Sequence, residues 1–532
     1  MVAARENFPL LAELLAEQQQ LDTPVARFAL AHESGDPFAE FRAQLIPLTA
    51  PRPGEQYAFE VELDSCTGCK ACVAACHALN GLDETESWRD VGLVIGGDER
   101  DPFQQTVTSA CHHCADPACL NGCPVLAYEK DPATGIVRHL DDQCIGCQYC
   151  ILKCPYDVPK YNARLGIVRK CDLCQGRLGA GEAPACAQAC PTQAIRIVTV
   201  AVGAAARPDL SVESEESRRK DPSAAFLRAA PDPAHTRPTT RYLSERRQPA
   251  NLQAADAAVL RPQPPHWPLA IMLTLLPLAV GSHVLAALVG TAATRSASAP
   301  AIVIHYMTIA GWVAGVAGLA ASVGHLGQPR RAWRVFLGWR RSWLSREALG
   351  FGGWFGVASV ALWVPEAVPA AAVLGAAGLF CSAMIYIDTR RAAWRWTQTL
   401  PRFLGAAAGL GAAMGVALGV APKAGALAVG AATVLKLGCD ARLLRCLDFV
   451  DEDDLPDARV RTARLLRGPL RRAFGGRIVV ALLTLMFVTM ACAGGGGRVG
   501  GLLLAAAVCG ELIERHLFFR AVDAPKMPGV PG

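Results

Sequence analysis

The stretch CIGCQYCILKCP, at residues 144–155, is one of four cysteine motifs that decide the fold of the first half of the chain. The motifs lie between residues 66 and 190. The four groups are Cys66, Cys69, Cys72 and Cys76; Cys111, Cys114, Cys119 and Cys123; Cys144, Cys147, Cys150 and Cys154; and Cys171, Cys174, Cys186 and Cys190. Each group opens with CxxC and closes with CxxxC. This regular spacing indicates four repeats of one metal-binding loop.

Three of the four closing cysteines are followed by proline, at Pro124, Pro155 and Pro191. CxxCxxC followed by CP is the spacing of bacterial ferredoxin loops that hold [4Fe-4S] clusters. Such a cluster takes three thiolates from one tight loop and a fourth from elsewhere in the chain. The groups differ only between the second and third cysteines, where the fourth group carries the insertion 175–185. The sequence therefore predicts four [4Fe-4S] clusters.

The groups are expected to work in pairs, because the last cysteine of each motif ligates the other cluster in two-cluster ferredoxins. We infer that group one pairs with group four, and group two with group three. The predicted ligand sets are Cys66, Cys69, Cys72 and Cys190; Cys76, Cys171, Cys174 and Cys186; Cys111, Cys114, Cys119 and Cys154; and Cys123, Cys144, Cys147 and Cys150.

Two other uses of the cysteines are less favoured. Four zinc sites would also use CxxC pairs, but the repeated CxxxCP endings disfavour zinc. A disulfide framework is disfavoured because crowded CxxCxxC runs cannot bridge internally without strain, and because the start of the chain lacks a secretory signal. The zinc interpretation stays open as a non-redox, zinc-binding membrane scaffold.

The expected fold combines two classes. Alternating apolar residues predict strands at 57–63, 135–140 and 194–198, beside the cysteine motifs. We therefore expect an α+β, tandem ferredoxin-like four-cluster domain. After about residue 267 Ala, Gly, Leu and Val dominate, which predicts an all-α polytopic membrane bundle of about eight helices.

Composition divides the chain into five segments. They are an N-terminal helical extension at 1–56, the four-cluster domain at 57–200, a linker at 201–265, a transmembrane quinone-interacting anchor domain at 266–515, and a tail at 516–532. The net charge of +5 over 532 residues gives no reason to expect a nucleic-acid partner.

Eight apolar spans are expected to cross the lipid bilayer. Their approximate limits are 267–290, 301–324, 348–364, 367–387, 403–421, 423–437, 478–493 and 499–514. A helix crosses the hydrocarbon in roughly 20 residues, so the sixth span, with Lys436 near its end, is the weakest. Glu511 and Glu514 lie near the end of the last span, and no proton path across the bilayer is expected.

Arginines set the expected orientation. The loops at 325–347, 388–402 and 438–476 are rich in arginine and share one face with both termini. Because positive loops stay in the cytoplasm, we expect a multi-pass protein of the cytoplasmic (inner) membrane with its iron-sulfur domain on the cytoplasmic face.

A quinone site is expected where the membrane half meets the clusters. His325 ends the second span on the cluster side and is followed by Arg330 and Arg331. A histidine there is suited to bind a quinone carbonyl and to exchange its proton. Asp388, after the fourth span, is a candidate proton relay, although it also suits an ion pair with Arg390.

Both halves resemble one known family. The cysteine groups resemble the iron-sulfur subunit of the dimethyl sulfoxide reductase family of molybdopterin oxidoreductases. The second half resembles that family's membrane anchor subunit through GHLGQPRRAWRVFLGWRRSWLSRE at 324–347, CSAMIYIDTRRAAW at 381–394 and ARLLRGPLRR at 463–472. The resemblance covers most of residues 57–515, and the two subunits look fused.

The resemblance implies a partner and a direction along the clusters. The partner would be a separate molybdopterin catalytic subunit carrying molybdenum bis(pterin), a cofactor that belongs to the partner and not to this chain. The ligand set with Cys190 would lie towards this partner and the set with Cys123 towards the membrane. His325 would then be the quinone-binding histidine, with menaquinone or ubiquinone as bound substrate.

We expect an electron-transfer and membrane-anchor subunit of anaerobic electron transport, rather than a catalytic subunit. It would relay electrons through four [4Fe-4S] clusters between the molybdenum subunit and the membrane quinone pool. Two alternatives within this class are a cytoplasm-facing sulfite:quinone dehydrogenase and a polysulfide or other sulfur-compound reductase.

Overall fold

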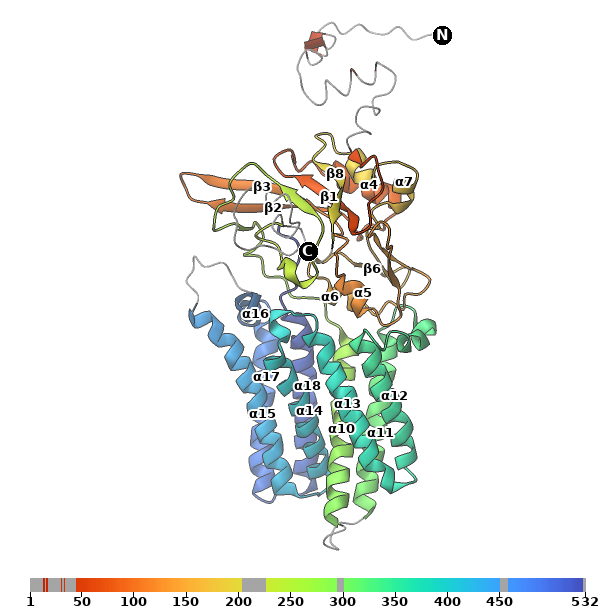
Figure 1. The fold of residues 1–532 in the computed structure, drawn as a ribbon. Helices are drawn as coiled ribbons and strands as arrows, with labels where there is room; N and C mark the ends of the chain where they lie inside the picture. The colour runs from red at the N-terminus through yellow and green to blue at the C-terminus, as the bar shows by residue number, and fades with distance from the viewer. Residues whose placement is uncertain are drawn as a thin grey trace, which may run out of the picture.

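The computed structural model describes residues 45–202, 226–293, 301–449 and 458–529, together with a few isolated residues before position 45. Most of the predicted N-terminal extension, 1–56, lies outside the described residues. The described chain forms an α+β domain that sits on one end of a helical bundle (Figure 1).

Two three-stranded sheets frame the α+β domain. In the first, β1 (Glu55–Glu62) lies between antiparallel β8 (Ile195–Ala201) and parallel β9 (Arg241–Leu243). In the second, β2 (Asp90–Gly97) lies between β3 (Pro102–Ser109) and β10 (Gln253–Ala254). Two small hairpins complete the set: β4 (Tyr128–Lys130) with β5 (Val137–His139), and β6 (Lys160–Asn162) with β7 (Ile167–Arg169). The strands predicted at 57–63, 135–140 and 194–198 are confirmed in β1, β5 and β8.

The short helices of this domain repeat with the cysteine motifs. They are α4 (Ala71–Asn80), α5 (Ala118–Gly122), α6 (Tyr149–Lys153), α7 (Gln175–Gly179) and α8 (Ala185–Gln188). Helices α4, α5, α6 and α8 each begin one residue before the third cysteine of a group, whereas α7 lies in the insertion of the fourth group. The four groups are therefore built on one local pattern.

The described part of the predicted linker is folded onto the α+β domain. Strands β9 and β10 belong to its sheets, and Phe226, Leu227 and Tyr242 are buried in a core that also contains Val61. These apolar side chains gain more by burial than they would in an extended linker. Residues 226–265 are accordingly part of the domain.

The second half contains eight long helices in the described residues. They are α10 (Trp267–Ala293), α11 (Ala301–Gly324), α12 (Trp343–Ala361), α13 (Val368–Ile387), α14 (Trp396–Ala417), α15 (Pro422–Leu444), α17 (Arg471–Cys492) and α18 (Gly497–Arg520). A shorter helix, α16 (Ala458–Arg467), precedes α17. Short 3-10 segments lie at Pro329–Phe336, Pro365–Ala367, Ala392–Trp394 and Arg445–Phe449.

Six of these helices are long and apolar enough to cross a membrane: α10, α11, α13, α14, α15 and α17. The span predicted as the weakest, 423–437, is one of them, because α15 extends for 23 residues. Helices α12 and α18 are not among the six, and each carries charged residues within its length, such as Glu347 and Glu514. The chain is a multi-pass membrane protein with six candidate spans.

The eight helices form two neighbouring groups, α10 to α13 and α14, α15, α17 and α18 (Figure 1). Helix α10 packs against both α14 and α18 and so joins the groups. At the crossing of α10 and α14, a Cβ on Gly281 would lie 2.0 Å from the Ala407 carbonyl oxygen. Glycine is needed there because the two backbones touch.

The predicted tail returns to the α+β domain. After α18 ends, Asp523 pairs with Arg461 at 2.9 Å, and Lys526 pairs with Asp256 at 2.5 Å. Met527 is buried in the core beside β1 and β3. The last helix is thus fastened back onto the domain above it.

Candidate functional site

The cysteines gather in the four sets that the spacing predicts. Burial raises the pKa of Cys66, and negative charge on Cys72, Cys190 and Cys69 raises it further. In the second set, burial raises the pKa of Cys76 to about 12, with further contributions from Cys186 and Cys174. Cysteines from groups one and four therefore lie together.

The other two groups pair in the same way. Burial raises the pKa of Cys114, and the charges of Cys111, Cys154 and Cys119 act on it as well. All four of these cysteines line one cavity. In the last set, burial raises the pKa of Cys150, and the negative charges of Cys147, Cys144 and Cys123 raise it further. The structure thus brings each predicted ligand set together, while iron ligation itself stays a prediction.

The sets follow one another as a series. The negative charge of Cys186 in the second set raises the pKa of Cys72 in the first. The negative charge of Cys111 in the third set raises the pKa of Cys171 in the second. Tyr128 lies close both to Cys119 of the third set and to Cys150 of the fourth. Cysteines of neighbouring sets therefore lie close enough to affect one another electrostatically.

One backbone conformation recurs at the start of every cysteine loop. The second residue after the opening cysteine has a positive φ in all four groups: Gly68 at 74°, His113 at 41°, Gly146 at 69° and Leu173 at 61°. This left-handed turn aims the amide N–H back at the opening sulfur. The Gly146 amide donates to Cys144 Sγ at 3.4 Å, and the Leu173 amide to Cys171 Sγ at 3.4 Å.

The closing CP segments share a second left-handed residue. The third residue after the closing cysteine has a positive φ at Leu126 (57°), Asp157 (54°) and Gln193 (53°). Near Leu126, the Ala127 amide donates to Cys123 Sγ at 3.2 Å. Repeated N–H···S bonds favour the thiolate form, which is the form that binds iron.

The donor geometry fits clusters better than single metal ions. In the part of the chain that the structure describes, no three His, Cys, Asp or Glu side chains converge closely enough to hold one metal ion. A zinc ion needs four sulfurs within about 2.3 Å of itself, whereas the corners of a cubane lie further apart. All 21 cysteines are free of disulfide bonds, so a disulfide framework is excluded in this structure.

Two buried cations lie among the cysteines, and the sequence analysis missed both. Arg89, 1% exposed, is held by Thr108 at 3.1 Å and faces cysteines of the first two sets. Its Nε and Nη2 atoms have no hydrogen-bond partner among the described residues. Lys170, 3% exposed, faces Cys111 and Cys119 of the third set. Positive charge at these places offsets the negative charge of a bound cluster.

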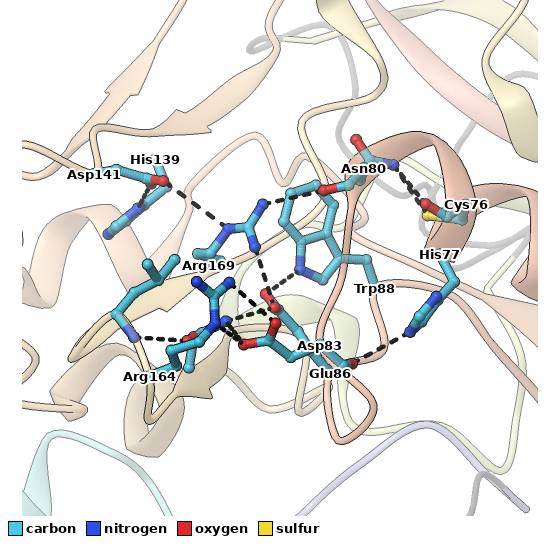
Figure 2. Close-up of polar contacts among 12 residues, drawn as sticks. Cys76, His77, Asn80, Asp83, Glu86, Trp88, His139, Asp141, Arg164 and Arg169 are labelled. Carbon is cyan, nitrogen blue, oxygen red and sulfur yellow. Dashed lines mark hydrogen bonds and ion pairs between the residues drawn. The ribbon is translucent and has the colours of Figure 1, made fainter.

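A polar network runs beside the cluster loops (Figure 2). Asn80 donates to Cys76 Sγ at 3.6 Å, and Arg169 donates to the Asn80 carbonyl at 3.3 Å. The Arg169 guanidinium also lies 3.9 Å from Asp141, which contacts His139 at 2.7 Å. The network joins the end of the first cysteine group to the start of the third.

His139 sets the charge of Cys144. Burial alone would raise the pKa of Cys144, but the hydrogen bond from His139 and its positive charge outweigh burial, so the pKa lies below its usual value. Burial lowers the pKa of His139, yet Asp141 and Cys144 together raise it above its usual value. The opening thiolate of the fourth set is therefore stabilised before any iron binds.

The loop that follows α11 packs against the third cysteine loop. The Gln328 amide donates to the Ile145 carbonyl at 3.0 Å. Arg331 donates to the carbonyls of Asp141 at 3.0 Å and Cys144 at 3.2 Å. Farther along, Ser342 donates to the Gly122 carbonyl at 2.7 Å, next to Cys123. The fourth set is thus the one that faces the membrane helices.

His325 lies directly beside this set. Burial and the charge of His266 lower the pKa of His325 to about 4, against a hydrogen bond with the Cys147 backbone that raises it. The His325 and His266 rings meet edge to face with centroids 5.7 Å apart. The imidazole is therefore neutral near pH 7 and contacts the backbone of a predicted cluster ligand.

The other candidate quinone residues do not all surround His325. Arg331 bonds the cysteine loop, and Arg330 is exposed. Asp388 pairs with Lys153 of α6 at 2.7 Å and accepts from Tyr149 at 3.4 Å. Glu347 is buried near the start of α12, and the sequence analysis did not select it. No sequence pattern singles out Glu347, because its burial depends on helix packing.

Together these features define a membrane-bound iron-sulfur electron-transfer protein. The model of the 4Fe-4S dicluster domain family matches residues 103–200, and that of the DMSO reductase anchor subunit (DmsC) family matches residues 263–435. The protein is 39% identical over 150 residues to the B subunit of the anaerobic dimethyl sulfoxide reductase of Haemophilus influenzae, covering 26% of this sequence and 73% of that relative.

Similar relatives occur in Escherichia coli. The B subunit of the anaerobic dimethyl sulfoxide reductase of strain K12 is 38% identical over 148 residues, which cover 26% of this sequence and 72% of the relative. The formate dehydrogenase-O iron-sulfur subunit is 35% identical over 162 residues, which cover 27% and 54%. The chain belongs to the dimethyl sulfoxide reductase family, as an iron-sulfur electron-transfer subunit fused to a membrane anchor.

Proposed function

We propose that this chain passes electrons one at a time between a separate molybdenum bis(pterin) catalytic subunit and a quinone bound beside His325. The observation that carries this proposal is the series of cysteine sets that ends where His325 contacts the Cys147 backbone. The 16 cysteines would hold four [4Fe-4S] clusters, which supply one-electron transfer when bound. The chemistry of the substrate belongs to the catalytic partner.

His325 suits the quinone end for a physical reason. A neutral imidazole can donate a hydrogen bond to a quinone carbonyl or accept one from a quinol hydroxyl. His325 also lies at the cluster-side end of α11, next to the set from which electrons would arrive or to which they would leave. Menaquinone and ubiquinone both carry the carbonyl groups that such a histidine recognises.

We also propose that the cluster domain faces the cytoplasm. The arginine-rich loops after α11 and α13 contact the cluster domain through Arg331 and Arg391. These loops therefore share a face with the clusters, and positive loops stay on the cytoplasmic side. The eight long helices would then all run through the bilayer.

The test is a redox titration of membranes that contain the whole complex, followed by electron paramagnetic resonance with and without a quinone-site inhibitor. Four reducible clusters are expected, with one signal shifted by the inhibitor. His325→Ala should abolish that shift, whereas His305→Ala, an exposed histidine in α11, should retain it. If neither the inhibitor nor the mutation changes the cluster signals, His325 is not part of the quinone site. If the protein contains zinc and no iron, the proposed electron relay is refuted.

The proposed orientation favours one second candidate. A catalytic partner on the cytoplasmic side suits a sulfite:quinone dehydrogenase, in which electrons enter from sulfite and leave to quinone. Dimethyl sulfoxide should oxidise the reduced clusters if the complex is a reductase, whereas sulfite should reduce the oxidised clusters if it is a dehydrogenase.

A further inference from the structure

A network of buried charges lies in the second group of membrane helices. It joins side chains from four helices: Arg402 of α14, Lys436 and Asp440 of α15, Arg477 of α17, and Glu511, Glu514 and Arg515 of α18. The ion pairs are Arg402–Asp440 at 2.7 Å, Arg402–Glu514 at 3.1 Å, Lys436–Glu511 at 2.5 Å, Lys436–Glu514 at 3.3 Å, Arg477–Asp440 at 2.7 Å, Arg477–Glu514 at 2.8 Å and Arg515–Glu511 at 2.7 Å. Glu514 meets three of the four cations.

If its role were only to hold the helices together, the network of buried charges would be unfavourable in free energy. Glu511, Glu514 and Arg515 are at most 1% exposed, and removing such charges from water costs several kcal/mol per ion. The pairs are also incompletely bonded. Among the described residues, Arg515 Nε and Nη1 donate no hydrogen bond. Apolar side chains would join these helices at lower cost.

Two cavities flank the network. The first is lined by Thr433, Thr484 and Glu511, and the second by Gln398 and Asp440, with Thr462 of α16 at its cluster-domain end. Each has a volume of about 40 Å³, and both are lined by Arg477 and Glu514. A space of this size holds roughly two or three water molecules. The Arg477–Glu514 pair therefore separates one small cavity near the cluster domain from another deeper between the helices.

The network approaches His325 through aromatic rings. The Arg515 guanidinium lies 4.3 Å from the centre of the Phe403 ring and 5.8 Å from that of Phe518. One residue on, Phe519 meets His266 at 5.5 Å, and His266 meets His325 at 5.7 Å. The rings of Phe518, Phe519 and His266 lie between the Arg515 guanidinium and the proposed quinone histidine.

We propose that the two cavities and the charged side chains between them form a hydrated path for protons between the cluster-domain face and the membrane interior. The inference rests on the proposed function. A quinone that accepts two electrons from the clusters takes up two protons and becomes a quinol, and the protons come from water on the cluster-domain face. Quinol oxidation sends two electrons to the clusters and two protons back along the path. Glu514, which lines both cavities, passes protons between them.

The path ends inside the bundle on the cluster-domain side. The network lies within the first two turns of α14 and α17, counted from the cluster domain, since Arg402 and Arg477 are each six residues after the start of their helix. Proton exchange with the same face that holds the clusters requires no passage across the bilayer.

Hydration is tested first, on the wild-type complex in lipid. Hydroxyl radicals generated from bound water by X-ray pulses label the side chains next to that water, and mass spectrometry locates the label. Leu437 lines the first cavity, whereas Leu435, on the same helix, is 49% exposed on the outer surface. Water in the cavity should label Leu437 about fivefold faster than Leu435. Equal labelling would show a dry cavity and overturn the proposal.

Proton delivery is tested with two variants. Glu514→Gln removes the shared carboxylate. The double change Glu511→Leu with Arg515→Met removes both members of the Arg515–Glu511 pair, and Lys436, which loses Glu511, keeps its pair with Glu514 at 3.3 Å. Each should slow quinone-linked oxidation of the clusters about tenfold and enlarge the solvent isotope effect in D₂O. Reduction of the clusters by a soluble one-electron donor should keep its wild-type rate. Glu366→Gln, an exposed carboxylate before α13, serves as the control.

The outcomes separate this proposal from the function on which it rests. If wild-type clusters never respond to quinone, the proposed function fails, while the labelling still decides whether the cavities are wet. If both variants keep the wild-type rate of quinone-linked cluster oxidation, the network only holds the helices together, and the proposed proton path is overturned. If Glu514→Gln fails to fold, the double variant decides.

Discussion

Lys153 Nζ lies 2.7 Å from Asp388 Oδ2 and 2.9 Å from the Asp388 carbonyl oxygen, so one ammonium group fastens the third cysteine motif to the end of α13. The side chain of Lys153 is 5% exposed and that of Asp388 is 36% exposed. The pair places Asp388 in the junction between the two halves of the chain. Asp388 therefore helps to hold the cluster domain against the membrane helices.

Asp388→Asn should therefore loosen the cluster domain. The substitution leaves a buried ammonium with only neutral acceptors, which should cost about 1–3 kcal/mol in the free energy of unfolding. We expect a fall of several degrees in the temperature at which the iron-sulfur absorbance is lost. Glu129→Gln breaks an ion pair with Arg138 whose side chains are 48% and 44% exposed, and should change that temperature little. Equal effects of the two variants would contradict this assignment of Asp388.

Replacing the closing cysteines tests the pairing of the groups. In the proposed arrangement Cys123 belongs to the set next to His325, although it closes the second group, and Cys154 belongs to the third set. Cys123→Ser should therefore alter the resonance signal that responds to a quinone-site inhibitor. Cys154→Ser should alter a different signal and leave the inhibitor response intact. The reverse pattern would mean that each group keeps its own cluster.

The cysteine spacing was sufficient to predict the four cysteine loops because the geometry of each loop is local. Left-handed residues such as Gly68 and Gly146 fix the loop within a few residues of the sulfurs. The inferred pairing of groups one and four places Cys76 with Cys174 and Cys186, and the structure brings these cysteines together. The apolar runs likewise predicted where the long helices lie.

Features that depend on contacts distant in sequence were not predictable in this way. Arg89 lies between two motifs without any pattern, and only the packing of the sheets places it among the cysteines. Lys436 seemed to weaken the sixth span, yet it is paired with Glu511 on another helix. Tyr242 looked like part of a linker because its partner in the neighbouring strand β1 is Val61, which lies far earlier in the sequence.

Removing the charge of Arg89 should shift reduction potentials. A buried cation beside a cluster favours the reduced, more negative state, so Arg89→Gln should lower the potentials of the clusters held by the first two sets. Shifts on the order of tens of mV are expected in a redox titration. The half-exposed Arg138 offers a control, because Arg138→Gln changes the net charge equally at a distance from those sets. Unchanged potentials in Arg89→Gln, with all clusters present, would show that the guanidinium is neutralised by other groups.

Gly327 tests whether close contact between the two halves is needed for electron exchange. A Cβ at this position would lie 2.1 Å from the Gly166 carbonyl oxygen and 2.7 Å from the Tyr161 hydroxyl, so Gly327→Ala must separate the loop after α11 from the β6–β7 hairpin. Separation moves His325, two residues earlier, away from the third cysteine loop. We expect the four clusters to assemble and quinone-linked oxidation to slow about tenfold, because a displacement near 1 Å is enough to disturb a reacting geometry.

Gly324→Ala is the matched control for this change. It also adds a methyl group close to His325, but a Cβ on Gly324 meets nothing within 4 Å. Rates should therefore stay at the wild-type value in Gly324→Ala and fall in Gly327→Ala. If both variants keep the wild-type rate, electron exchange with quinone does not depend on the contact at Gly327, and the quinone would have to bind elsewhere along α10 to α13. If both slow equally, an added methyl group near His325 is harmful in itself, and the backbone contact with Gly166 is not the cause.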